Sequence, residues 1–192
     1  RITDKELAST QSSAAENNIS STNSQEKVEV LSSLPKSFRR GSKKATIEEV
    51  RILNIDDKEI RENHSVEFNE KVKILIKIRA NQSFKSYIVG FHICDKNGNE
   101  LIATNTQQEE IELGELNPLD EIIIKFELNL PLKPTSYSLS VAVTAGYEET
   151  TSDWIDNAIV FQVSPPNNGK KIHGMVYLPV KISSKKMSSL PS

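Results

Sequence analysis

Regular alternation of apolar and polar side chains constrains the fold of this chain more than any other feature of its sequence. Residues 87–106, YIVGFHICDKNGNELIATNT, show the alternation best. Every second position at the start of this segment is apolar, namely Tyr87, Val89, Phe91 and Ile93. The Asn97-Gly98 pair that follows is typical of a short hairpin turn, which needs residues that tolerate positive φ. Because side chains alternate between the two faces of a strand, this segment predicts a β-hairpin with one apolar face.

Four other segments repeat this period of two. Their apolar positions are Val72, Ile74, Ile76 and Ile78; Ile122, Ile124, Phe126 and Leu128; Tyr137, Leu139, Val141 and Val143; and Ile155, Ile159, Phe161 and Val163. A further segment, ATIEEVRIL, has irregular spacing between Ile47 and Val50, which predicts a β-bulge. The segment IHGMVYLPV at 172–180 predicts a last strand beyond a Pro-Pro-Asn-Asn-Gly linker. Such a strand can pair with its own domain or be exchanged with a second copy.

About eight short strands, separated by turn signals and without a convincing amphipathic helix, favour an all-β fold. We predict an antiparallel β-sandwich, with a partly closed barrel as the alternative. Residues 1–37 are rich in Ser, Thr, Asn, Gln and Glu, which predicts a disordered or weakly helical linker; a chain end without function is the alternative. The sandwich domain is predicted over 38–181 and a disordered C-terminal tail over 182–192.

Charge and composition exclude several classes of function. The net charge of -2 gives no electrostatic reason to expect binding to nucleic acid or to an anionic membrane. A single cysteine, Cys94, rules out a disulfide within the chain and fits a reducing compartment. No apolar run reaches the roughly 18 residues of a membrane helix. We therefore expect a soluble chain, and one that is part of a longer protein because it begins with Arg1.

The residue patterns of known catalytic and metal sites do not occur in the sequence. The three histidines, His64, His92 and His173, are far apart, and neither zinc spacing nor a phosphate-binding glycine loop occurs. Adjacent carboxylates point to opposite faces of a strand, so Asp56-Asp57 is interpreted as solvated turn charges. Residues 95–99 resemble a calcium loop but lack its distal glutamate. The sequence therefore predicts a binding module without catalysis, cofactor or metal.

Several segments together resemble one known family. The lead-in RRGSKKATIEEVRIL, the hairpin GFHICDKNGNELIATNT, the strand SYSLSVAVTA and the ending NAIVFQV…HGMVYLPV, in this order and spacing, are similar to the C-terminal carbohydrate-binding domain of Wzt-type ATP-binding subunits of O-antigen polysaccharide ABC transporters. The resemblance covers residues from about Phe38 to Val180. It implies an immunoglobulin-like sandwich that recognises the capped non-reducing end of a lipid-linked O-polysaccharide before export.

The resemblance also implies partners and a location. Family members form homodimers, in some of which the C-terminal strand is exchanged, and they act with the ATP-binding and membrane subunits of the transporter. The location implied is the cytoplasm, at the inner face of the inner membrane. No ATP hydrolysis is expected of this chain, because the nucleotide-binding domain of the family does not occur in its sequence.

A carbohydrate site needs rigid polar groups and an aromatic face that covers the apolar side of a sugar ring. We place it on the outer face of one sheet, where Gly90 and Ala142 are small. The predicted site residues are His92, Thr104, Thr106, Ser138, Ser140, Trp154, Tyr147 and Arg79. Trp154, the single tryptophan, would supply the stacking wall, and Arg79 or Arg51 would pair with an anionic cap.

Each of these residues has a structural alternative. His92 fits an ordinary exposed strand histidine, and Trp154 fits a cap on one end of the core. The Ser/Thr face fits a merely solvated surface. Lys73, Lys77 and Arg79 fit charges that protect an edge strand from aggregation.

Three functions were compared on this basis. The first is a non-catalytic reader of polysaccharide ends that raises the local concentration of finished chains at an exporter. The alternative is an immunoglobulin-like module for protein interaction or dimerisation without glycan binding. A glycan hydrolase is disfavoured, because no acid/base pair of carboxylates is evident.

Overall fold

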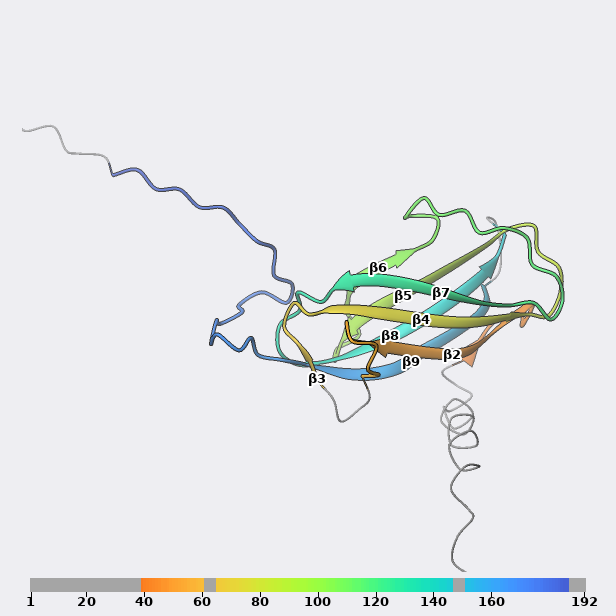
Figure 1. Ribbon diagram of the computed structural model, residues 1–192, viewed down its shortest axis with the longest axis horizontal. Helices are drawn as coiled ribbons and strands as arrows, with labels where there is room; N and C mark the ends of the chain where they lie inside the picture. Colours follow the sequence, from red (N-terminus) through yellow and green to blue (C-terminus); the bar gives the residue numbers. More distant parts are fainter. Residues whose placement is uncertain (1–38, 61–64, 147–150, 187–192) are drawn as a thin grey trace, which may run out of the picture. The chain divides into compact units, whose positions relative to one another are not determined.

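Two sheets make up the part of the chain that the computed structural model describes, residues 39–60, 65–146 and 151–186. Nine strands run through these residues (Figure 1). They are β1 (Arg39–Arg40), β2 (Ala45–Leu53), β3 (Ser65–Glu67), β4 (Lys71–Ala80), β5 (Tyr87–Asp95), β6 (Glu100–Asn105), β7 (Glu121–Asn129), β8 (Ser136–Ala145) and β9 (Thr151–Ser164). In these residues no helix is long and apolar enough to cross a membrane. The predicted linker 1–37 lies outside the described residues, and the domain limits stay a prediction.

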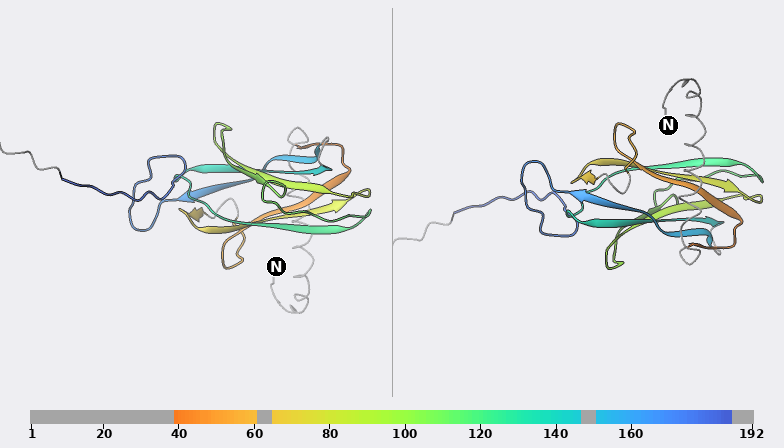
Figure 2. Two further views of the ribbon diagram at one scale, coloured as in Figure 1. Left: turned by 90° about the horizontal axis from the view of Figure 1, so that it is seen from above. Right: turned by 90° about the horizontal axis from the view of Figure 1, so that it is seen from below.

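The predicted β-sandwich is confirmed. The larger sheet has the order β1-β9-β8-β5-β6, and β3 joins it by pairing with β9 in parallel. The smaller sheet has the order β2-β4-β7 and is antiparallel throughout. Figure 2 shows the two sheets facing each other as separate layers. The hairpin of β5 and β6 is also confirmed, with Gly98 at φ 82 in its turn.

The alternating apolar side chains form the core between the two sheets. The inward residues of β4, β5 and β8 are all buried, as their period of two predicts. Each such Ile, Leu or Phe contributes about 1.5–3 kcal/mol through its removal from water. The inward residues of β7 are only half-buried, because β7 is an edge strand. The predicted bulge in β2 is present as a register shift between Ile47 and Glu49.

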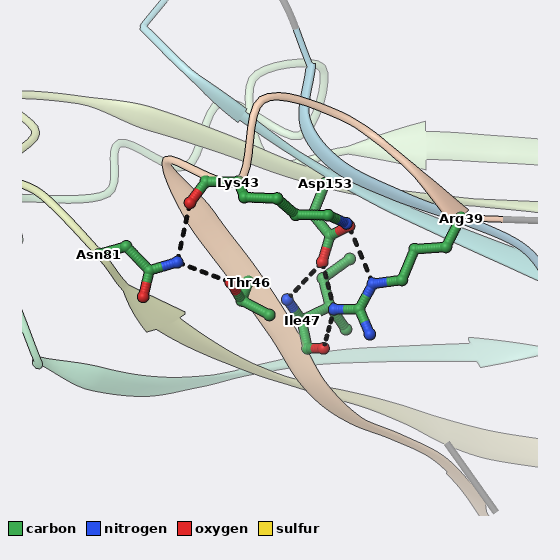
Figure 3. A network of polar contacts seen from close by, with 6 residues as sticks. All are labelled: Arg39, Lys43, Thr46, Ile47, Asn81 and Asp153. Atoms are coloured by element: carbon green, nitrogen blue, oxygen red, sulfur yellow. Dashed lines mark hydrogen bonds and ion pairs between the residues drawn. The ribbon is translucent and has the colours of Figure 1, made fainter. Parts of the chain in front are cut away.

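One side of the sandwich is closed by a buried carboxylate (Figure 3). The Asp153 side chain of β9 is 0% exposed and receives hydrogen bonds from Arg39 Nε, Lys43 Nζ and the backbone N of Ile47. Arg39 Nη2 also donates to the carbonyl oxygen of Ile47, at 2.7 Å. Since Ile47 belongs to β2, this cluster connects an outer strand of the smaller sheet to β9. At the opposite side, β6 and β7 are the edge strands of the two sheets, and the described residues show no β-pairing between them (Figure 1).

Lys43 is fixed by a second set of polar contacts in the same loop. Asn81 Nδ2 donates to the carbonyl oxygen of Lys43 at 2.8 Å and to Thr46 Oγ1 at 2.7 Å (Figure 3). The loop before β2 is therefore fastened to the end of β4 as well as to β9.

Two predictions on strands are corrected. The segment 172–180 forms no strand; its pairing is one bridge between Leu132 and Val176, with a hydrogen bond from Tyr177 N to Pro131 O. Beyond that bridge the described residues of the segment have no further sheet pairing, and Leu178, Val180 and Ile182 are 71%, 74% and 86% exposed. The charges of Lys73, Lys77 and Arg79 do not protect an edge, because β4 is the central strand of its sheet.

Candidate functional site

The outer face of the larger sheet brings together side chains from four neighbouring strands. On β5 and β8, His92 lies opposite Ser140. On β9, Trp154 lies opposite Ala142 of β8 on one side and Arg40 of β1 on the other. Because paired residues share a face, His92 and Trp154 project from the same side of the sheet, separated by β8.

Trp154 is the centre of a connected group of side chains. Its ring lies edge-on to that of His92, with centroids 5.1 Å apart at 76°. The guanidinium carbon of Arg40 lies 4.6 Å from the indole centroid. The indole Nε1 donates to Asp156, and Asp156 also forms an ion pair with Arg40. These contacts hold the indole in one position, which favours a rigid recognition surface over a mobile one.

A hollow of about 670 Å³ lies beside this group. Its lining includes His92, Cys94, Ser138, Trp154, Asp156 and Val160, together with the turn of the β5–β6 hairpin. His92 Nδ1 lies 2.9 Å from Glu100 Oε1, so the imidazole is oriented by a carboxylate at the rim. The hollow thus combines an aromatic ring, a carboxylate, an imidazole and a hydroxyl on adjoining strands.

The surroundings of two ionisable groups at the hollow, Cys94 and Asp95, shift their pKa values. Burial, with the charges of Glu100, Asp95 and Asp156, raises the pKa of the Cys94 thiol and so disfavours its thiolate form. Hydrogen bonds from Asn99 lower the pKa of Asp95, and the bond from the Asn99 side chain has the largest effect. The Asp95 carboxylate accepts hydrogen bonds from Asn97 N and Asn99 N at 2.8 and 2.9 Å, so it stabilises the turn between β5 and β6. The described residues contain no cluster of three or more His, Cys, Asp or Glu side chains suited to a metal.

Three of the predicted site residues, His92, Ser138 and Trp154, do line this hollow. Ser140 lines it too, but it is only 6% exposed. Its Oγ accepts a hydrogen bond from Asn157 N at 3.0 Å. Asn157 has a φ of 51°, in an irregular part of β9, so the Ser140 hydroxyl supports the backbone there.

Thr104 and Thr106 do not share the face of His92, so the prediction that places the three side chains on one face is wrong. Ala103 lies opposite His92, whereas Thr104 lies opposite the core residue Phe91. Thr106 is 3% exposed, and its Oγ1 accepts from the backbone N of Val89 at 3.2 Å. The sequence held a usable signal, because a two-residue turn centred on Asn97-Gly98 already pairs His92 with Ala103.

The remaining predicted residues lie elsewhere. Arg79 belongs to β4 of the other sheet, where it pairs with Glu48. Tyr147 lies outside the described residues. Conversely, Arg40 and Asp156 were not predicted, because their pairing joins positions 116 residues apart and leaves no local pattern.

A second hollow, of about 690 Å³, lies at the open side between β6 and β7. It is lined largely by apolar side chains, including Phe91, Ile102, Ile111, Ile124, Phe126 and Leu128. Phe91 and Phe126 meet there edge to face, with centroids 5.1 Å apart. Thr104 and Thr106 line this hollow, which has the character of an exposed part of the core.

Three carboxylates line the outer hollow, those of Asp95, Glu100 and Asp156. Each already has a partner within the domain: backbone N of Asn97 for Asp95, His92 for Glu100 and Arg40 for Asp156. The strand order and the two facing sheets define an immunoglobulin-like antiparallel β-sandwich. Comparison with known proteins makes this more specific. Residues 36–178 match the family model described as the Wzt C-terminal domain, and the chain belongs to that family.

A solved structure of the same family supports the fold. The crystal structure of the C-terminal domain of Wzt has 22% sequence identity and a TM-score of 0.68, covering 77% of this chain and 88% of that one. A CARDB domain from Pyrococcus furiosus has 15% identity over 65% of this chain and 97% of its own, with a TM-score of 0.36. No curated protein matches the chain. Membership of this non-catalytic family supports, in general terms, a carbohydrate-binding role in O-antigen ABC transport.

Proposed function

We propose that this domain binds the capped non-reducing end of a lipid-linked O-antigen polysaccharide in the hollow beside Trp154. The observation that carries the proposal is the fixed indole of Trp154, set in a hollow with polar groups from adjoining strands. A sugar ring has an apolar C–H side that suits an indole and hydroxyls that suit carboxylate, imidazole and hydroxyl groups. Family membership supports the same class of ligand.

The proposed contacts follow from the geometry of the hollow. Trp154 stacks on the ring, His92 and Ser138 bond hydroxyls, and Asp156 and Glu100 act as acceptors at the rim. Thr104, Thr106 and Arg79 are left out, because they lie in the other hollow or on the other sheet. A contribution from Tyr147 stays a prediction.

Binding of this kind would couple chain completion to export without catalysis. The domain holds a finished polysaccharide close to the ATP-binding and membrane subunits of its transporter and so raises its effective concentration there. The proposed location is the cytoplasmic face of the inner membrane.

Calorimetric titration with capped and uncapped polysaccharide tests the proposal. We expect tighter binding of the capped chain, and a loss of about tenfold or more in affinity for Trp154→Ala, since the variant lacks the apolar indole surface that covers the C–H side of the ring. His92→Ala should weaken binding to a smaller extent. Thr104→Ala is the matched control and should leave the affinity unchanged, because Thr104 lies in the other hollow. Equal affinity for the two polysaccharides would refute recognition of the cap.

A second proposal concerns dimerisation, and the exposed C-terminal segment favours it. Leu178, Val180 and Ile182 occupy alternate positions and are largely exposed, as in a strand whose partner lies elsewhere. The apolar hollow between the edge strands β6 and β7 has room for such side chains. The segment also carries Lys181, Lys185 and Lys186, whereas Glu109, Glu110 and Glu112 lie at or beside the hollow. We propose that this segment is exchanged between two copies.

Contacts of Tyr177 indicate where the exchanged segment begins. Tyr177 packs against Phe68 with ring centroids 5.6 Å apart, and Lys170 Nζ lies 3.9 Å from the Tyr177 ring centroid. Residues up to Tyr177 therefore belong to their own domain, and truncation after Tyr177 should convert a dimer to a monomer in light scattering. Replacing Leu178, Val180 and Ile182 by Ser in the full chain should do the same. A dimer that survives both changes excludes the exchange. Dimerisation without any glycan binding would favour the protein-interaction function instead.

A further inference from the structure

The aromatic face proposed for sugar stacking is already occupied by a side chain of the same domain. The guanidinium of Arg40 lies over the Trp154 ring, with its central carbon 4.6 Å from the centroid. The same guanidinium pairs with Asp156, which also accepts a hydrogen bond from the indole Nε1. Arg40 thus engages the two groups of the hollow that a sugar ring would use most, an apolar face and a carboxylate.

Arg40 can leave the indole without disruption of its strand. The neighbouring residue Arg39 points the other way, to the fully buried carboxylate of Asp153, and fixes β1 against β9. The Arg40 side chain, by contrast, is 61% exposed, and its partner Asp156 is 31% exposed. Exposed ion pairs and exposed cation–π contacts are weak, so rotation of this one side chain costs little.

We propose that Arg40 is a gate over Trp154, and that a ligand enters by exchanging the guanidinium for an uncharged sugar ring. This rests on the function proposed above. The ring places its C–H side on the indole, and its hydroxyls donate to Asp156 in place of Arg40. An anionic group would instead pair with Arg40 and leave the indole covered. The gate therefore selects a neutral, hydroxylated ring for the position next to Trp154.

The closed gate can be tested without any glycan, because the chain has one tryptophan. Quenching of Trp154 fluorescence by acrylamide measures access to the indole. We expect Arg40→Ala to raise the quenching constant by about half or more. Asp156→Asn keeps an acceptor for the indole but weakens the hold on Arg40, and it should act in the same direction. Arg79→Ala, on the other sheet, is the matched control and should change nothing. Unchanged quenching in both Arg40→Ala and Asp156→Asn would overturn the gate.

Affinity for the capped polysaccharide separates the gate from a direct ligand contact. If a sugar must displace Arg40, Arg40→Ala binds about two- to fivefold tighter than the unmodified chain, since the competing contact is gone. Weaker or equal binding by Arg40→Ala would contradict the exchange, and weaker binding would make Arg40 a contact of the ligand. If the unmodified chain binds no glycan, the proposed function fails, and the quenching experiment alone decides whether Arg40 covers Trp154.

Discussion

Arg39 and Asp153 form a two-point ion pair between β1 and β9: Nη2 lies 2.5 Å from Oδ2 and Nε lies 3.1 Å from Oδ1. The carboxylate is 0% exposed and also accepts a hydrogen bond from the backbone N of Ile47, 2.9 Å away on the other sheet. Asp153 is therefore the acceptor through which β1, β2 and β9 are held together.

Asp153→Ala should lower the free energy of unfolding by about 3 kcal/mol, because breaking a buried pair leaves Arg39 and Ile47 N without their acceptor. Urea denaturation gives the measurement. Asp153→Asn should cost less, since an amide oxygen still accepts from Ile47 N. Glu121→Ala, which removes an exposed pair with Lys77, is the control and should change stability little. A small effect of Asp153→Ala would show that the cluster does not support the fold.

Gly90→Ala should destabilise the domain by about 1–3 kcal/mol through overpacking. A Cβ at this position would lie 2.8 Å from both Asn105 Cβ and the carbonyl oxygen of Thr104. The carbonyl belongs to β6, so the hairpin itself would have to shift. Gly114→Ala meets nothing within 4 Å and should be nearly neutral in the same thermal unfolding experiment. Equal melting temperatures for the two variants would mean that β6 shifts to accommodate the added methyl group without loss of stability.

Alkylation of Cys94 should report on the hollow, because the raised pKa of its thiol lowers the fraction of thiolate at a given pH. The pH at which the alkylation rate reaches half of its maximum should be higher for the folded chain than for the same chain in urea. A polysaccharide bound in the hollow should slow the reaction further. If the two pH profiles coincide, the surroundings of Cys94 do not disfavour the thiolate.

Alkaline pH should weaken the fold through Tyr137. Burial, together with the charge of Asp95, raises the pKa of this phenol to about 12. The folded-state pKa is above the unfolded value of about 10, so the stabilising effect is complete below pH 10 and is lost as the pH rises toward 12.

Urea unfolding between pH 10 and pH 12 measures this loss of stability, and phenolate absorbance over the same interval follows the ionisation of the tyrosines. The Tyr137→Phe variant should lose less stability over this pH interval than the unmodified chain. Part of the loss should remain, because burial also raises the pKa of Tyr87. At neutral pH the variant should be about 1 kcal/mol less stable, because Tyr137 Oη donates to the carbonyl oxygen of Lys133 at 2.6 Å. An identical pH dependence in both proteins would exclude Tyr137 as the cause.

The site was predictable where it depended on residues of one strand or on the two strands of a tight hairpin. His92 and Ser138 were assigned correctly to the outer face, because the period of two within β5 and β8 fixes it. Thr104 and Thr106 were assigned wrongly, because the face of a residue on β6 depends on its register against β5. The contact of Arg40 with Trp154 had no signal in the sequence, since the β1–β9 pairing joins distant parts of the chain.

The sequence by itself determined the class of fold and its core. Burial of alternating apolar side chains is a local property of each strand, and it holds whichever strands become neighbours. Only the tertiary structure decided that β4 is central, that residues 178–182 leave the sandwich, and that Trp154 is covered by Arg40. These features depend on strand order and register, which arise from contacts between distant residues and not from the pattern within any one strand.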